Sequence, residues 1–191
     1  LQETLGFSFH DRGILTQALV HRSYLHEHPE SVLPSNERLE FLGDAILGLL
    51  VAEHIYRRYP EMSEGELTAL RSAVVKAPFL ARLAMEIRLG DYLLMGKGEE
   101  ASGGRTRSAI LAGAFEALIG AIFIDQGPDV ARSFVLRHFV PVLDNLVHAC
   151  LGGDDKSSLQ ELTQAVLGIT PSYRVVETRG PDHDRLFTVE V

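Results

Sequence analysis

Apolar side chains recur every three or four residues through most of the first 150 positions, which is the spacing of one buried face of an α-helix. The breaks between these runs carry proline or glycine, as in Tyr59-Pro60 and Gln126-Gly127-Pro128. We therefore predict an all-α domain over residues 1–149. Its helices are expected in Ile14–Tyr24, Leu39–Tyr59, Leu67–Val75, Phe79–Leu89, Ile110–Ile124 and Val130–Leu146.

The pattern changes after the stretch LGGDDKS, whose glycines and charges are typical of a linker, which we place at residues 150–156. A short helix is predicted over Ser157–Leu167, followed by two segments of alternating apolar and polar residues on either side of Gly180-Pro181. These segments, SYRVVETRG and DRLFTVEV, predict two strands. One helix and two strands leave a sheet edge uncovered. We therefore expect residues 157–191 to be the first part of a small α+β domain that is incomplete in this chain.

The segment NERLEFLGDAIL places three acidic residues on one face of a predicted helix. Glu37, Glu40 and Asp44 are spaced three and four positions apart, and each position turns the helix by about 100°. Asn36 is predicted to cap this helix, because a short polar side chain there can accept a backbone N–H bond. The apolar residues of the other face are predicted to pack into the core; they are Leu39, Leu42, Ile46 and Leu49.

Two interpretations of this acidic face are open. It can be a solvated surface, which is the usual position of a run of charges. Like charges at these spacings, however, repel by about 0.2–0.5 kcal/mol per pair. The helix continues as an apolar run beyond Asp44, so the carboxylates are expected to be only partly exposed. Converging carboxylates in such a place favour a hard divalent cation such as Mg²⁺ or Mn²⁺.

A single acid interrupts the most apolar run of the chain, ILAGAFEALIG. Glu116 is the only ionisable residue between Ser108 and Ile124. A buried carboxylate is costly unless it is protonated, paired or bound to a metal. If the two helices pack side by side, Glu116 can share one cation with Glu40 and Asp44. The alternative is a salt bridge to an arginine, for which the candidates are Arg71, Arg105 and Arg107.

Composition narrows the class of protein. The net charge of −8 argues against an open basic groove for nucleic acid, but a metal-dependent nuclease remains compatible with it, because bound cations neutralise an acidic site. Cys150 is the only cysteine, which excludes an intrachain disulfide and fits a reducing compartment. The first residues do not resemble a signal peptide, so we expect a cytoplasmic protein.

Two further classes of function are not expected. The apolar run 108–124 is rich in alanine and glycine and contains only 17 residues, so we predict a buried helix and no membrane partner. Gly96-Lys97-Gly98 has neither the spacing of a Walker loop nor that of a dinucleotide-binding loop. We therefore expect no nucleotide cofactor.

Five blocks of the sequence resemble the bacterial ribonuclease III family and occur in that family's order. They are ALVHRSY (18–24), NERLEFLGDAIL (36–47), LRSAVV (70–75), GKGEEASGGRTR (96–107) and AFEALIGAIFIDQG (114–127). The tail resembles the first helix and first two strands of a double-stranded-RNA-binding domain. The resemblance implies a helical endonuclease domain of the ribonuclease III fold that forms a homodimer.

The resemblance also implies an activity and its residues. The expected reaction is Mg²⁺-dependent hydrolysis of double-stranded RNA in the processing of rRNA and mRNA, with Mn²⁺ as a substitute and with 5′-phosphate and 3′-hydroxyl products. Glu40 and Glu116 correspond to metal ligands, and Asp44 is expected beside the metal, where it orients the attacking water. Glu37 corresponds to an accessory acid near the RNA. Phe41 corresponds to a side chain that enters a pocket of the partner subunit.

In the tail, the resemblance implies RNA contacts for four residues. Gln160, Glu161 and Gln164 share a helix face and are expected along a minor groove of the duplex, and His183 is expected in the next groove. The alternative is that these polar side chains are simply solvated.

One position departs from the family pattern at the second acidic centre. Gly113 stands where an aspartate is expected, three residues before Glu116, and glycine has no side chain with which to bind a cation. We expect metal binding through the remaining acids with reduced affinity. Two other interpretations stay open: a non-catalytic double-stranded-RNA-binding protein on the same fold, or an enzyme that was deliberately inactivated.

Overall fold

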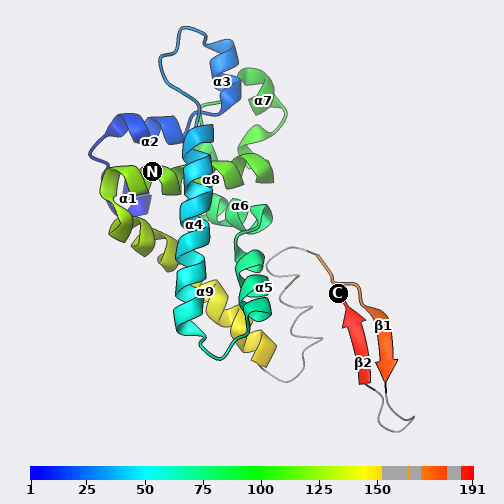
Figure 1. Cartoon of the computed structure of the whole chain (residues 1–191). Helices are drawn as coiled ribbons and strands as arrows, with labels where there is room; N and C mark the ends of the chain where they lie inside the picture. The colour runs from blue at the N-terminus through cyan, green and yellow to red at the C-terminus, as the bar shows by residue number, and fades with distance from the viewer. Residues whose placement is uncertain (152–162, 164–168, 180–185) are drawn as a thin grey trace. The chain divides into compact units, whose positions relative to one another are not determined.

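We describe a computed structural model in which residues 1–151, 163, 169–179 and 186–191 are placed (Figure 1). The chain divides into two units, Leu1–Asp144 and Asn145–Val191.

The first unit is built from helices, as the apolar periodicity predicts. Its α-helices, of which the last continues into the second unit, and its two 3₁₀ turns are α1 Gln2–Leu5, α2 Arg12–Ala18, α3 Arg22–Glu27, α4 Glu37–Arg58, α5 Glu64–Val74, α6 Ala77–Glu86, η1 Leu89–Tyr92, α7 Lys97–Ala101, η2 Gly104–Thr106, α8 Ser108–Gln126 and α9 Pro128–Leu151.

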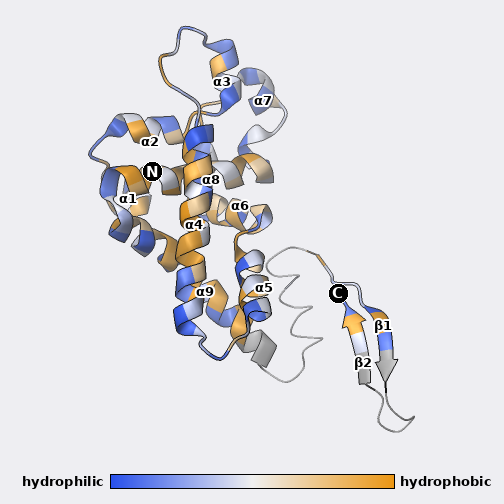
Figure 2. Cartoon of the chain, viewed as in Figure 1, coloured by the Kyte–Doolittle hydropathy of each residue, from blue (hydrophilic) through white to orange (hydrophobic). Residues whose placement is uncertain are grey.

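Helix α8 lies at the centre of the first unit. It packs against α2, α4 and α6, and every residue from Leu111 to Ile122 is buried except Glu116, which is half-buried. Burial on all sides explains why this helix is apolar around its whole circumference. Among the described helices, α8 is the one long and apolar enough to cross a membrane, and here the same composition makes it a core helix (Figure 2).

Helices α4 and α8 touch through their backbones. A Cβ atom added to Gly43 of α4 would lie 1.8 Å from the carbonyl oxygen of Glu116, and one added to Gly120 of α8 would lie 2.4 Å from the carbonyl oxygen of Leu39. Only glycine permits this approach, since any side chain at either position would overlap the opposite backbone. The close crossing places the acidic face of α4 beside the acid of α8.

The prediction of one helix over Ile14–Tyr24 is wrong. Helix α2 ends at Ala18 and α3 begins at Arg22, and between them Val20 forms a parallel bridge with Leu94. The amide of His21 donates to the carbonyl of Leu94 (2.9 Å), and the amide of Leu94 donates to the carbonyl of Leu19 (2.8 Å). These bonds replace the helical ones.

The predicted helix over Phe79–Leu89 is also shorter than expected. Helix α6 ends at Glu86, and Arg88 then adopts a left-handed backbone conformation with φ of 54°, which a continuing right-handed helix does not accommodate. The chain proceeds into the turn η1.

Asn36 does not cap α4. Its backbone is already helical, and its side chain makes no capping bond. The side chain is buried, and its Nδ2 donates to the carbonyl of Ala18 at 3.4 Å. Asn36 therefore joins the start of α4 to the end of α2.

The core face of α4 also differs from the prediction. Leu39 and Ile46 are buried, but Leu49 is 67% exposed. Two more large side chains project from the same helix, Phe41 at 80% and Tyr56 at 71% exposure. At about 100° per residue these three side chains share one broad face, which we call the α4 apolar face.

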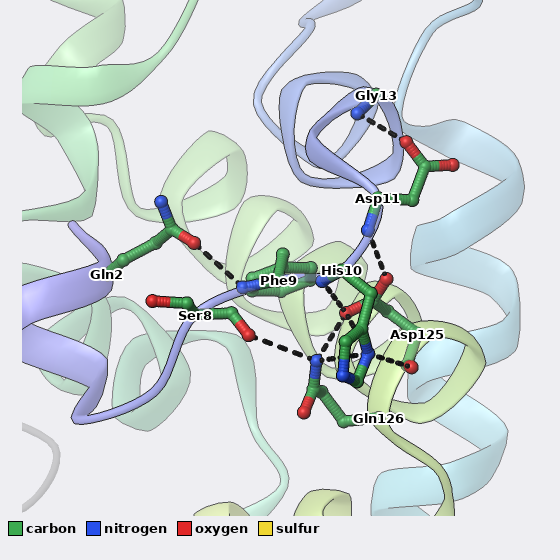
Figure 3. A network of polar contacts seen from close by, with 8 residues as sticks. All are labelled: Gln2, Ser8, Phe9, His10, Asp11, Gly13, Asp125 and Gln126. Carbon is green, nitrogen blue, oxygen red and sulfur yellow. Dashed lines mark hydrogen bonds and ion pairs between the residues drawn. The ribbon is translucent and has the colours of Figure 1, made fainter.

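The N-terminal segment is held by the end of α8 (Figure 3). The Asp125 carboxylate, 3% exposed, accepts the backbone N–H groups of His10 (2.9 Å) and Asp11 (2.7 Å), and Gln126 donates to the carbonyl of Ser8 (3.1 Å). Burial alone raises the pKa of Asp125, but the bonds from Asp11, Gln126 and His10 outweigh it and lower the pKa. The network thus favours a charged Asp125 carboxylate, which fixes the N-terminal segment against the end of α8.

In the second unit, β1 (Arg174–Arg179) pairs with β2 (Leu186–Glu190) in antiparallel register, with an irregularity between Val175 and Glu177. This confirms the two predicted strands. The predicted turn at Gly180-Pro181 lies outside the described residues. So does the predicted helix over Ser157–Leu167, except for Thr163, which is helical.

Candidate active site

The close crossing of α4 and α8 creates an acidic hollow. Its lining consists of Glu37, Glu40, Phe41 and Asp44 from α4 and Glu116 from α8. All four acids singled out in the sequence are thus brought together, although Glu116 is separated from the others by more than seventy residues. We use the name acidic hollow for these five residues.

The acids of this hollow raise each other's affinity for protons. Burial, followed by the charges of Asp44 and Glu40, raises the pKa of Glu116 to about 7. Burial also raises the pKa of Glu40, and the neighbouring charge of Glu37 adds to it, while Arg22 opposes the shift. Raised carboxylate pKa values mean that the negative charge here is poorly compensated by the protein.

The arginines proposed as partners of Glu116 do not pair with it among the described residues. Arg105 donates to Glu100 (2.6 Å) and to the carbonyl of Gly90 (2.8 Å), and Arg107 pairs with Glu99. Arg71 lines a separate groove together with Leu49 and Tyr56, and within the described part of the chain it makes no ion pair with Glu116. The salt-bridge interpretation of Glu116 is therefore wrong, and its charge is left for a cation or a proton.

Gly113 shapes the position of Glu40. A Cβ atom added to Gly113 would lie 2.9 Å from Cδ and from both carboxylate oxygens of Glu40. The end of the Glu40 side chain therefore occupies the space that an aspartate at this position would enter. Because the obstacle is the end of a flexible side chain, Glu40 can rotate away from α8 without any movement of the backbone.

The donor atoms fit a hard divalent cation. Within the described residues, no three side chains of His, Cys, Asp or Glu already converge on one point. Three uncompensated carboxylates repel one another, so a cation or a shared proton between them favours their convergence. Glu40, Asp44 and Glu116 offer only oxygen ligands around one hollow, which is the ligand type that Mg²⁺ and Mn²⁺ prefer.

A second pocket adjoins the acidic hollow and was not foreseen from the sequence. It is lined by His21, Arg22, Asn36, Glu37, Glu40, Ala109, Ile110, Gly113 and Ala114. His21 and Arg22 come from the start of α3, which reaches this place because of the bridge between Val20 and Leu94. Burial lowers the pKa of His21, which favours a neutral ring.

Of the remaining candidates, Phe41 borders the acidic hollow and is exposed. Its contact with a second subunit stays a prediction. The four residues expected to contact RNA, Gln160, Glu161, Gln164 and His183, lie outside the described residues. Their roles stay predictions as well.

Comparison with known proteins agrees with these features. Residues 11–143 match a family model described as ribonuclease-III-like. A protein named Ribonuclease 3 from Pelotomaculum thermopropionicum is 47% identical over 191 residues, covering 100% of this chain and 79% of the relative. Another from Thermobifida fusca is 50% identical over 190 residues, covering 100% and 78%.

Among solved structures, the nuclease domain of ribonuclease III from Campylobacter jejuni is similar, with a TM-score of 0.67 and 39% identity. The match covers 72% of this chain and 92% of that domain. A family model over most of the chain, relatives at this level of identity and the shared helical fold lead to one conclusion: the chain belongs to the ribonuclease III family.

Proposed function

We propose that this protein is an endonuclease that hydrolyses phosphodiester bonds in double-stranded RNA, with rRNA and mRNA precursors as substrates. The observation that carries this proposal is that Glu40, Asp44 and Glu116 line one hollow of a ribonuclease III chain. A binding-only protein gains nothing from three carboxylates that raise one another's pKa, since the repulsion costs stability.

Glu40, Asp44 and Glu116 would hold a divalent cation, Mg²⁺ with Mn²⁺ as a substitute. When bound, such an ion lowers the pKa of a water molecule and stabilises the departing oxygen. The protein's own part is to keep the oxygen ligands on two helices whose spacing is fixed by Gly43 and Gly120. Glu37 lies at the edge of the site, where Ser35 Oγ donates to its carboxylate at 2.8 Å.

Incubation with duplex RNA and Mg²⁺ tests the function, with the product ends mapped. The expected result is cleavage of both strands to give 5′-phosphate and 3′-hydroxyl ends. Tight duplex binding without cleavage at high Mg²⁺ or Mn²⁺ would favour the non-catalytic alternative, which Gly113 supports because it removes a possible ligand.

The Gly113→Asp variant is expected to cleave at lower Mg²⁺ concentration than the parent chain. The new carboxylate adds a hard oxygen ligand beside Glu40, whose movable end lies 2.9 Å from the new Cβ position and can rotate away. A shift of the half-maximal Mg²⁺ concentration by about ten-fold corresponds to about 1.4 kcal/mol of binding free energy. The measurement is a Mg²⁺ titration of the initial cleavage rate.

Gly113→Ala is the matched control. It displaces Glu40 in the same way but supplies no ligand, so its Mg²⁺ requirement should not fall. Equal Mg²⁺ dependence of the parent chain and Gly113→Asp would show that Gly113 is not a defect in metal binding.

We also propose that the α4 apolar face binds a second copy of the chain. Phe41, Leu49 and Tyr56 are exposed, and a groove lined by Leu49, Ala52, Tyr56, Met62 and Leu67 among others adjoins them. Large exposed apolar patches mark interaction sites. The Campylobacter jejuni neighbour is described as flexible in a region involved in dimer formation.

Replacing Phe41 with alanine is expected to shift the protein from dimer to monomer at micromolar concentration, as measured by sedimentation velocity. Removal of a buried aromatic anchor at an interface commonly costs about 2 kcal/mol or more. Val32→Ala, also at an exposed apolar residue but outside helix α4, should leave the dimer intact. A dimer of unchanged affinity in Phe41→Ala would exclude this face as the interface.

A further inference from the structure

The pocket beside the acidic hollow differs from it in its polar groups. The hollow offers carboxylates, whereas the pocket adds the imidazole of His21 and the guanidinium of Arg22. The two cavities share Glu37 and Glu40 and therefore adjoin each other. The chemistry of these two groups decides what the pocket can bind.

The hydrogen bonds of His21 fix which ring nitrogen carries the proton. The backbone N–H of Ser23 donates to His21 Nδ1 at 3.3 Å, and a backbone N–H can only donate. Nδ1 is therefore an acceptor, so the neutral ring must carry its hydrogen on Nε2. Within the described residues Nε2 has no hydrogen-bond partner, so a donor is left over at the pocket.

Ser23 holds this arrangement in place. The amide of Gly96 donates to Ser23 Oγ at 2.9 Å, and Ser23 Oγ lies 2.8 Å from His21 Nδ1. Since Nδ1 accepts, the hydroxyl donates to it, and the chain from Gly96 through Ser23 ends at an oriented imidazole. Ser23 is a positioning residue for His21.

Arg22 is only loosely engaged. Its guanidinium lies 3.9 Å from Glu37, and the two side chains are 70% and 57% exposed. An exposed pair of this kind is worth little, so a stronger acceptor can take over the guanidinium. Glu37 keeps its bond from Ser35 when this happens.

We propose that the Nε2–H of His21 and the guanidinium of Arg22 bind a non-bridging phosphate oxygen of the RNA strand, at a linkage next to the one that is cut. Both groups are donors, and a phosphate oxygen only accepts, which matches them. Gly113 contributes by its lack of a side chain, because an aspartate there would add a third carboxylate to the pocket lining beside Glu37 and Glu40. This inference rests on the proposed function.

Equilibrium binding tests it without any need for cleavage. The ligands are a duplex RNA and a set of duplexes in which one linkage near the cut site is a methylphosphonate, which replaces a non-bridging oxygen by a methyl group. Binding is measured in Mg²⁺ in the Glu116→Gln background, so that the RNA stays whole. On the unmodified duplex, Arg22→Ala should weaken binding about ten-fold and reduce the slope of log K against log salt by about one.

The decisive result is whether the loss of affinity caused by the protein substitution and the loss caused by the methylphosphonate are additive in free energy. At one linkage the methylphosphonate should weaken binding to the parent protein but have no further effect on Arg22→Ala. Arg12→Ala, a loss of an exposed arginine outside both cavities, should retain the full methylphosphonate effect. If the two losses multiply at every linkage tested, the phosphate subsite is excluded.

Two His21 variants separate the hydrogen bond from packing. Gln supplies an N–H donor on a side chain of similar reach, and Leu does not. We expect His21→Gln to keep most of the affinity for RNA and His21→Leu to lose about as much as Arg22→Ala. When cleavage is measured with Glu116 in place, His21→Leu should raise KM and change kcat little. Equal losses in both variants would contradict a donor role. A parent chain that cleaves duplex RNA but shows no coupling removes only the subsite, whereas one that does not bind duplex RNA removes the proposed function as well.

Discussion

The Glu116→Gln variant is expected to lose cleavage and, at pH 8 without divalent metal, to be more stable than the parent chain. The loss follows from removing a proposed ligand of the cation, whose contribution of several kcal/mol corresponds to about 10³-fold in rate. The gain in stability follows from the position of Glu116 in the acidic hollow, where burial and the charges of Asp44 and Glu40 raise its pKa to about 7.

The direction of the pH dependence is opposite to that of a salt-bridged acid. The unfolded chain releases this proton near pH 4.5, whereas the folded protein holds it to about pH 7. Between these values the folded state binds more protons, so the free energy of unfolding falls as the pH rises. After allowance for the partial exposure of Glu116, the penalty above pH 7 is about 1–2 kcal/mol.

Urea unfolding in the presence of EDTA measures this effect. Glu116→Gln should exceed the parent chain by that amount at pH 8 and by much less at pH 5. Glu61→Gln, at an exposed carboxylate outside the hollow, serves as the control and should change stability by less than about 0.5 kcal/mol. Addition of Mg²⁺ should restore stability to the parent chain and leave Glu116→Gln unchanged. A variant no more stable than the parent at pH 8 would show that the carboxylate is not held under strain.

The second large effect is expected at Gly43, where alanine should lower the free energy of unfolding by about 3 kcal/mol. The added Cβ would stand 1.8 Å from the carbonyl oxygen and 2.5 Å from the carbonyl carbon of Glu116. Both atoms belong to the backbone, so relief requires α4 and α8 to separate. Cleavage should fall with stability, because the separation moves Glu40 and Asp44 away from Glu116.

Gly48, five residues farther along the same helix, provides the matched control. A Cβ added there meets no atom within 4 Å, so alanine should stabilise the helix by about 0.5–1 kcal/mol. Denaturant unfolding of the two variants side by side makes the comparison. Equal stability of Gly43→Ala and Gly48→Ala would contradict the backbone contact between α4 and α8.

Much of the first unit could be predicted because its signals are local. The periodicity of apolar residues predicts the long helices, and a lone acid in an apolar run indicates that Glu116 needs a partner from elsewhere. The spacing of Glu40 and Asp44 indicates a common face, and the structure brings both to Glu116. In each case the unfavourable alternative, either exposed apolar area or uncompensated charge, can be recognised from the spacing of residues in the sequence.

The errors arise where a distant segment decides the outcome. Leu19–His21 does not continue the helix because it forms backbone hydrogen bonds with Leu94, which is more than seventy residues away. No local sequence pattern indicates this bridge. Asn36 has a side chain that can cap a helix, but it donates a hydrogen bond to the carbonyl of Ala18 instead. Leu49 belongs to a helix that is apolar on more than one face, so the pattern alone does not say which face is covered by the same chain.

The glycines of this site differ in how well they tolerate substitution by another residue. At Gly43 and Gly120 the opposing atoms belong to the backbone of the other helix. Every substitution there is therefore expected to lower the stability of the fold, whatever its effect on catalysis. At Gly113 the opposing atoms are the movable end of Glu40, and the codons of glycine and aspartate are neighbours in the genetic code. Exchange between glycine and aspartate at position 113 therefore requires no movement of the backbone, whereas Gly43 and Gly120 are constrained by the packing of α4 against α8.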